Sequence, residues 1–226
     1  EKLSMSLTQA GTLTALVQLP SILNPLIGYL DDKINLRWMV IFAPAITATL
    51  MSAMGAAPSY YMLAILLAVA GLSVAAFHAT APAMVARVSG NKVGKGMSFF
   101  MAGGELGRTL GPLVAVWGVS MFALEGLYRL AVIGWITSLV IFLRFRNITP
   151  HVARQTGFRG LFPAARGLFL PIAIIVAGRS LLISSLGFYL PTLLKSEGAT
   201  LLAAGSALAI YQFAGVAGAL AGGTLS

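Results

Sequence analysis

Three ionisable residues lie in stretches of the sequence that are otherwise almost entirely apolar. Glu105 and Arg108 are three residues apart within residues 97–118, and Arg179 lies in a second apolar stretch, residues 168–193. A spacing of three puts Glu105 and Arg108 on one face of a helix, where they can pair. Within a membrane such charges are costly and usually face a cavity or a partner. The pattern therefore predicts either a structural ion pair or a site for protons or a charged substrate.

Other polar residues in apolar stretches extend this set. His78 and Glu105 each lie about eight residues, or about 12 Å of helix, from the basic segment between them. Arg108 and Arg179 share a second level, about 16 Å deep. We expect Glu105 to couple proton movement, with His78 relaying or sharing the proton. Hydrogen-bonded packing is the alternative role of His78.

Substrate binding is expected at the two deep arginines, since a guanidinium suits bidentate contacts to a carboxylate or phosphonate. Two unpaired guanidinium groups would repel one another, and Glu105 can neutralise only one of them. An anionic substrate would neutralise the other. A structural partner for Arg179 is the competing account. The glutamines at Gln18 and Gln212 are assigned to the same substrate site.

The composition indicates that these residues belong to a membrane protein. The 226 residues are 58% hydrophobic and 9% charged, whereas soluble domains carry about 25% charged residues. A crossing helix needs about 20 residues, and the continuous apolar runs exclude the alternation of a barrel strand. The sequence predicts an all-α, polytopic transmembrane helix bundle with about seven spans. These are residues 9–30, 39–57, 60–86, 97–118, 127–145, 168–193 and 201–224.

The basic residues give the orientation of the spans. They concentrate in and beside residues 31–38, 87–96 and 146–167, whereas the other side has Lys2, Arg129 and Lys195. The positive-inside rule makes the first three segments cytoplasmic in a multi-pass protein of the bacterial inner membrane. The first span then enters from outside, so we expect at least one further helix before residue 1.

Several function classes are disfavoured by the residues present. The net charge of +9 is scattered between apolar runs, which argues against nucleic-acid binding. The chain has no cysteine, and its two histidines, His78 and His151, are far apart, so no metal site is expected. No nucleophile–base constellation or phosphate loop is evident. We therefore expect no enzyme activity, no metal and no cofactor.

A basic linker and an internal repeat predict two halves. Residues 146–167 form a long polar segment between residues 1–145 and 168–226. When residues 10–28 are aligned with 204–222, Gln18 falls on Gln212 and Gly28 on Gly222, among other identities. Parallel helix bundles joined by a cytoplasmic linker are a known transporter architecture.

The charged turn GYLDDKINLR resembles the loop between the second and third helices of the major facilitator superfamily. The matching residues are Gly28, Leu30, Asp32, Lys33 and Arg37, whereas Asn35 and Leu36 depart from the pattern. The resemblance implies that residues 1–145 correspond to the family's helices 2 to 6, and 168–226 to helices 7 and 8. It also implies a gate: an acid at this helix end can pair with a base or cap another helix. A hydrophilic loop that serves only topology is the alternative.

A second region resembles the fosmidomycin-resistance-like branch of that family. The matching residues are Phe77, His78, Arg87, Gly103, Gly107, Leu110, Gly111 and Pro112, whereas Ala79-Thr80 replaces an expected Pro-Glu. Glycines spaced by four allow helix backbones to touch, and a proline can bend a helix. The sequence therefore predicts a tight packing seam along Gly103, Gly107 and Gly111, followed by Pro112.

These observations predict a secondary active transporter for proton-coupled efflux of a small, drug-like, anionic organic compound by alternating access. Its expected partners are the lipid bilayer, the small-molecule substrate and protons, and it is expected to be a monomer. A symporter for a sugar or organic acid is the first alternative. A non-transporting membrane assembly factor is the second, although a passive scaffold has little need of Glu105, Arg108 and Arg179.

Overall fold

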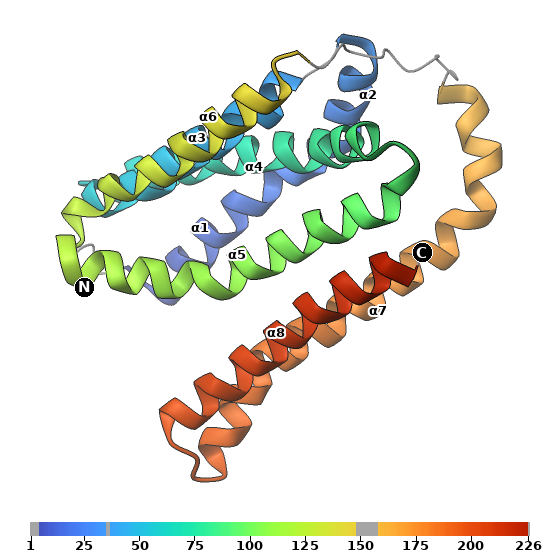
Figure 1. The fold of residues 1–226 in the computed structure, drawn as a ribbon. Coiled ribbons are helices and arrows are strands. Elements are labelled where there is room, and N and C mark those ends of the chain that lie inside the picture. The colour runs from blue at the N-terminus through green and yellow to red at the C-terminus, as the bar shows by residue number, and fades with distance from the viewer. Residues whose placement is uncertain (1–4, 35–36, 148–157, 226) are drawn as a thin grey trace.

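The protein is a bundle of long helices, shown in Figure 1. The computed structural model describes residues 5–34, 37–147 and 158–225, and these contain no strand. The helices are α1 (Leu7–Gln18), α2 (Asn24–Ile34), α3 (Arg37–Ala53), α4 (Tyr60–Ser89), α5 (Val93–Phe122), α6 (Ala131–Phe145), α7 (Phe158–Ser196) and α8 (Leu201–Leu225).

The described residues contain six candidate membrane spans. The third of them, Tyr60–Gly111, is 52 residues long and holds all of α4 and most of α5. Each of the seven predicted spans overlaps one of these six segments, with 60–86 and 97–118 sharing the third, and the all-α polytopic fold is confirmed.

The first predicted span is not one continuous α-helix. A 3₁₀-helical turn, Leu19–Leu23, separates α1 from α2, with proline in its first turn. Pro20 and Pro25 lack backbone N–H groups, so each removes a helical hydrogen bond. The turn and both helices pack against α4.

The charged segments are shorter loops than predicted. Residues 31–34 belong to α2 and residues 37–38 to α3, while α4 runs to Ser89 and α5 starts at Val93. Gly90, with φ +52°, makes the reversal between α4 and α5, a conformation that glycine adopts at little cost. The predicted bounds 31–38 and 87–96 are therefore a few residues too wide, since charged residues continue the helices on both sides of each turn.

The predicted linker is also partly helical, since α7 begins at Phe158. Residues 148–157 of that linker lie outside the described residues. So do Asn35, Leu36 and the side chains of Asp32 and Pro112.

Helices α3 and α6 pack closely against each other. A Cβ built on Gly134 would lie 2.5 Å from the carbonyl oxygen of Pro44. One turn later, the Ser138 hydroxyl accepts a hydrogen bond from the Ala45 N–H at 2.9 Å. Pro44 lies inside α3 and interrupts its backbone hydrogen bonding. The buried Ser138 of α6 supplies a partner to the neighbouring backbone N–H, as a membrane helix requires.

The glycine seam on α5 stays a prediction, because no described helix packs against it. No described atom lies within 4 Å of a Cβ built on Gly103, Gly107 or Gly111. At about 100° per residue, these glycines lie on roughly the opposite side of α5 from Glu105 and Thr109. That second side contacts α7 and α8.

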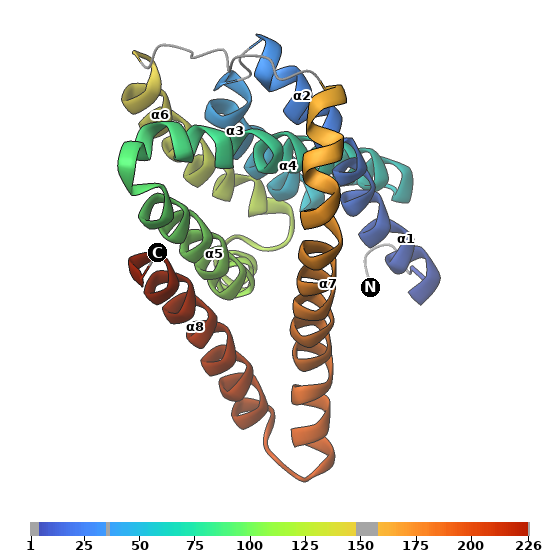
Figure 2. The same ribbon diagram turned by 90° about the vertical axis from the view of Figure 1, so that its right-hand side faces the viewer.

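The last two helices form a hairpin beside α5. Figure 2 shows α7 and α8 diverging from the turn that joins them, with α8 alongside α5. At this turn the Ala199 N–H bonds the Leu194 carbonyl at 2.9 Å, and the Gly198 N–H bonds the Lys195 carbonyl at 3.1 Å. With Gly198 at φ +85°, this is a Schellman motif, which closes the end of α7.

The Gly134 contact can be tested by substitution. Gly134→Ala places a methyl group against a backbone oxygen, so α3 and α6 must separate. Overpacking of this kind typically costs about 1–3 kcal/mol of unfolding free energy. The measurement is thermal or denaturant unfolding of the purified full chain in detergent. Gly103→Ala is the matched control, because it meets open space and gains helix propensity. Equal destabilisation by both substitutions would contradict the assignment.

Candidate functional site

One carboxylate lies between two guanidinium groups. Glu105 Oε2 is 3.6 Å from Arg108 Nη1 on the same helix, and Glu105 Oε1 is 3.6 Å from Arg179 Nη2 on α7. The Glu105 side chain is 18% exposed, whereas those of Arg108 and Arg179 are 61% and 60% exposed. Because two positive charges share one negative charge, the cluster carries one excess positive charge.

A hydrogen bond joins the same face of α5 to α8. The Thr109 hydroxyl donates to Gln212 Oε1 at 3.1 Å and also lies 2.9 Å from the Glu105 carbonyl oxygen. Thr109 is buried. The ion pairs and this hydrogen bond together connect α5 with both helices of the hairpin.

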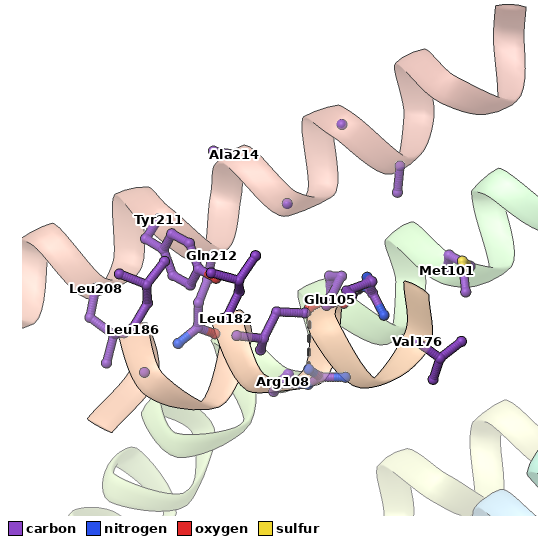
Figure 3. Close-up of a pocket in the computed structure, with 16 residues that line it drawn as sticks. Met101, Glu105, Arg108, Val176, Leu182, Leu186, Leu208, Tyr211, Gln212 and Ala214 are labelled. Atoms are coloured by element: carbon purple, nitrogen blue, oxygen red, sulfur yellow. Dashed lines mark ion pairs between the residues drawn. The ribbon is translucent and has the colours of Figure 1, made fainter. Parts of the chain in front are cut away.

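The charged cluster opens onto a cavity of about 1000 Å³ between α5, α7 and α8. Figure 3 shows Glu105 and Arg108 in its middle part, with Tyr211 and Gln212 contributed by α8. Most of the other lining residues are apolar. Such a cavity, apolar with a few polar groups, is the form that small-molecule sites usually take.

The structure therefore brings together four of the six residues predicted for proton coupling and substrate binding. Glu105, Arg108, Arg179 and Gln212 all line this cavity. Thr109 was missed by the sequence analysis, although its position four residues after Glu105 places both on one helix face.

His78 and Gln18 are not among the lining residues of this cavity. His78 is exposed on α4, with its ring edge-to-face with Phe77 at 5.8 Å between centroids. Gln18 is exposed at the end of α1, and its carbonyl oxygen accepts a hydrogen bond from Ser21 at 2.7 Å. The repeat that aligned Gln18 with Gln212 therefore does not give the two glutamines one shared site here.

The residues of the predicted gate lie at the end of α2 and the start of α3. Lys33 lies over the Tyr29 ring, 4.4 Å from its centroid. Arg37 lies over Trp38 at 5.0 Å and donates to the Arg146 carbonyl oxygen at 3.5 Å. These contacts connect the start of α3 to the end of α6. Of the remaining motif residues, Leu30 is exposed, and Gly28 has open space where a Cβ would lie.

The described residues contain no group of three or more His, Cys, Asp or Glu side chains that could hold a metal ion.

The sequence of the chain is similar to those of known proteins. The sequence model of the Major Facilitator Superfamily matches residues 1–226. The fosmidomycin resistance protein of Escherichia coli (strain K12) is 30% identical over 113 residues, which cover 50% of this chain and 28% of that protein. The matched region thus spans less than a third of that relative. No solved structure matches the chain significantly.

The shared carboxylate gives a prediction about stability. Glu105→Gln removes the negative charge between the two arginines, so their repulsion is no longer offset. We expect a loss on the order of 1 kcal/mol, which lowers the Tm by a few degrees. Added inorganic phosphate should restore part of that loss, because an anion can take the place of the carboxylate.

The measurement is the Tm of the purified full chain with and without phosphate. Glu197→Gln, at the exposed end of α7, is the control and should change neither value. An unchanged Tm for Glu105→Gln, or the same phosphate response in both variants, would contradict the prediction.

Proposed function

Because the chain belongs to the major facilitator superfamily of membrane transporters, we propose that it exports a small organic anion by proton-coupled alternating access. Its family and its apolar spans make it a multi-pass protein of the inner membrane, with the lipid bilayer as its surroundings. Its class is that of transporters rather than enzymes. We propose further that it works as a monomer.

The observation that carries this proposal is the carboxylate held between two guanidinium groups from separate helices. The cluster has one excess positive charge, and it faces a cavity large enough for a small organic molecule. A carboxylate or phosphonate ligand would balance that charge, and each guanidinium can bind it through two parallel hydrogen bonds. Gln212 and Tyr211 add polar groups on the opposite wall.

The position of the cluster supports alternating access. The Glu105–Arg179 ion pair and the Thr109–Gln212 hydrogen bond join residues 1–145 to residues 168–226, which we propose to be parts of two helix bundles. Movement of one bundle against the other changes these contacts, so ligand binding at the cluster is linked to that movement. The gate at Gly28–Arg37 is proposed to hold the cytoplasmic side closed in one of the two states.

The export direction is supported by the relative whose name states fosmidomycin resistance. Proton coupling is proposed to depend on Glu105, with His78 as the second proton-carrying group. Each arginine is paired with one oxygen of the same carboxylate, so a change in the charge of Glu105 would alter both ion pairs at once.

An organic-acid symporter is a second candidate, and the charge arrangement favours it. An anion that displaces Glu105 from the arginines leaves its carboxylate without a cation in largely apolar surroundings. In this mode a proton at Glu105 would accompany the anion, because the proton balances the charge that the arginines no longer balance. Proton and anion would then bind together, whereas exchange requires that each exclude the other.

The role of Arg179 is tested by ligand binding. Arg179→Gln should weaken the binding of small carboxylates or phosphonates by about tenfold or more, because a charge-assisted contact is lost. Arg179→Lys should retain part of the affinity, and neutral ligands should be unaffected. Binding is measured on the folded full chain, with Lys195→Gln on the same helix as the control. Equal affinity for all ligands in Arg179→Gln would favour a purely structural role.

The two coupling modes are separated by the pH dependence of anion binding. If protons and anion exclude each other, affinity falls as the pH is lowered; if they bind together, affinity rises. In Glu105→Gln the dependence should disappear in either case. A pH series of binding titrations on wild type and variant measures this. Persistence of the full pH dependence in Glu105→Gln would move the proton site away from Glu105.

A further inference from the structure

The cavity has two unlike parts on either side of the charged cluster. From Arg179 toward the Gly198 turn, its walls carry Leu182 and Leu186 on α7 and Leu208 on α8. Figure 3 shows these three leucines on one side of Glu105 and Arg108, with Met101 and Val176 on the other. We call the part lined by Leu182, Leu186 and Leu208 the leucine compartment.

The other part of the cavity has Met101 and Val176 on α5 and α7 and smaller residues on α8. Gly215, Gly218 and Ala219 lie beyond Gln212 in the direction away from the turn. A Cβ built on Gly215 or Gly218 would meet no atom within 4 Å, so this end is open. The two ends therefore differ in kind: the leucine compartment offers apolar contact surface, whereas the glycine end offers space.

The charged cluster and the leucine compartment lie within reach of one small molecule. Leu186 is about 10 Å along α7 from Arg179 at 1.5 Å per residue. A ligand with its negative charge at Arg108 and Arg179 would thus place a group of that length among the three leucines. Burying apolar surface there is favourable by about 0.8 kcal/mol for each methylene, or about fourfold in affinity.

We propose that the leucine compartment binds the apolar body of an amphipathic anion whose charged group lies between Arg108 and Arg179. The inference rests on the proposed function for the anionic group and adds the class of the remainder: a hydrophobic alkyl or aryl group. Leu182, Leu186 and Leu208 are then specificity residues, since they decide how much of the ligand is removed from water. A small polar anion would satisfy the arginines but leave the leucine compartment without an apolar contact.

The test is a chain-length series. The probes are n-alkylphosphonates from methyl to hexyl, titrated on the full chain in lipid nanodiscs, with empty nanodiscs subtracted to remove partition into lipid. Affinity should rise by about two- to fourfold for each added methylene. The matching n-alkanols, which lack the anionic group, should bind far more weakly. An affinity that does not change with chain length would overturn the proposal.

Substitutions locate the apolar body. Leu186→Ser and Leu208→Ser should flatten the dependence of affinity on chain length, with the largest loss of affinity for hexylphosphonate and the smallest for methylphosphonate. Leu186→Ala is a milder variant for use if Leu186→Ser does not fold. It should also reduce the gain in affinity per added methylene. Leu181→Ser is the matched control, because Leu181 is exposed on α7 and is not part of the cavity lining. If Leu181→Ser flattens the dependence of affinity on chain length equally, the assignment of the apolar body to the leucine compartment is overturned.

A transport assay separates this inference from the function on which it rests. Proteoliposomes with an imposed proton gradient report movement of the same phosphonates. A chain-length dependence in binding without proton-driven movement supports the leucine compartment and contradicts proton-coupled transport. Proton-driven movement of the phosphonates with no chain-length dependence in binding overturns the leucine compartment alone.

Discussion

A backbone that crosses hydrocarbon must satisfy its hydrogen bonds within the protein, and this constraint determines most of the structure. It makes the described residues helical, and it makes each break in a helix a position that needs a polar partner. The Ala45 N–H beside Pro44 finds that partner in Ser138 of α6. Thr47 and Ser73 bond each other between α3 and α4 at 3.0 Å. Helices α3, α4 and α6 are thus joined by short hydroxyl contacts between small residues.

The same constraint applies more strongly to charge. Glu105 is mostly buried, and both of its oxygens face arginines, one from its own helix and one from α7. Thr109, one turn further along α5, contacts α8. The α7–α8 hairpin is therefore held to α5 by polar contacts on one face. Apolar helix faces have little preference for one another in lipid, so directional contacts of this kind fix which faces meet.

The helices and the central cluster can be predicted from the sequence because each rests on a local rule. Apolar length gives the spans, and the spacing of Glu105 and Arg108 gives their shared face. The level of Arg179, counted from its span end, matches that of Arg108. The glycine positions cannot be judged in this way. Gly103, Gly107 and Gly111 have the spacing of a seam, but a Cβ built on any of them would meet no described atom within 4 Å, whereas Gly134 lies directly against the backbone of α3. The spacing shows that one helix face carries only small residues. Which such face packs against another helix is determined by the fold. His78 and Gln18 illustrate the same limit, since depth alone does not give direction around the helix axis.

The Schellman turn at Gly198 has a mechanical consequence. It fixes one end of α7 and α8 with two backbone hydrogen bonds, and the helices diverge from there. A change in the angle between two rods joined at one end displaces each point in proportion to its distance from the joint. Leu186 and Leu208, near the turn, move least, and Val176 and Gly218, further away, move most. If the angle between α7 and α8 changes, the part of the cavity lined by Leu186 and Leu208 therefore keeps its shape better than the part lined by Val176 and Gly218.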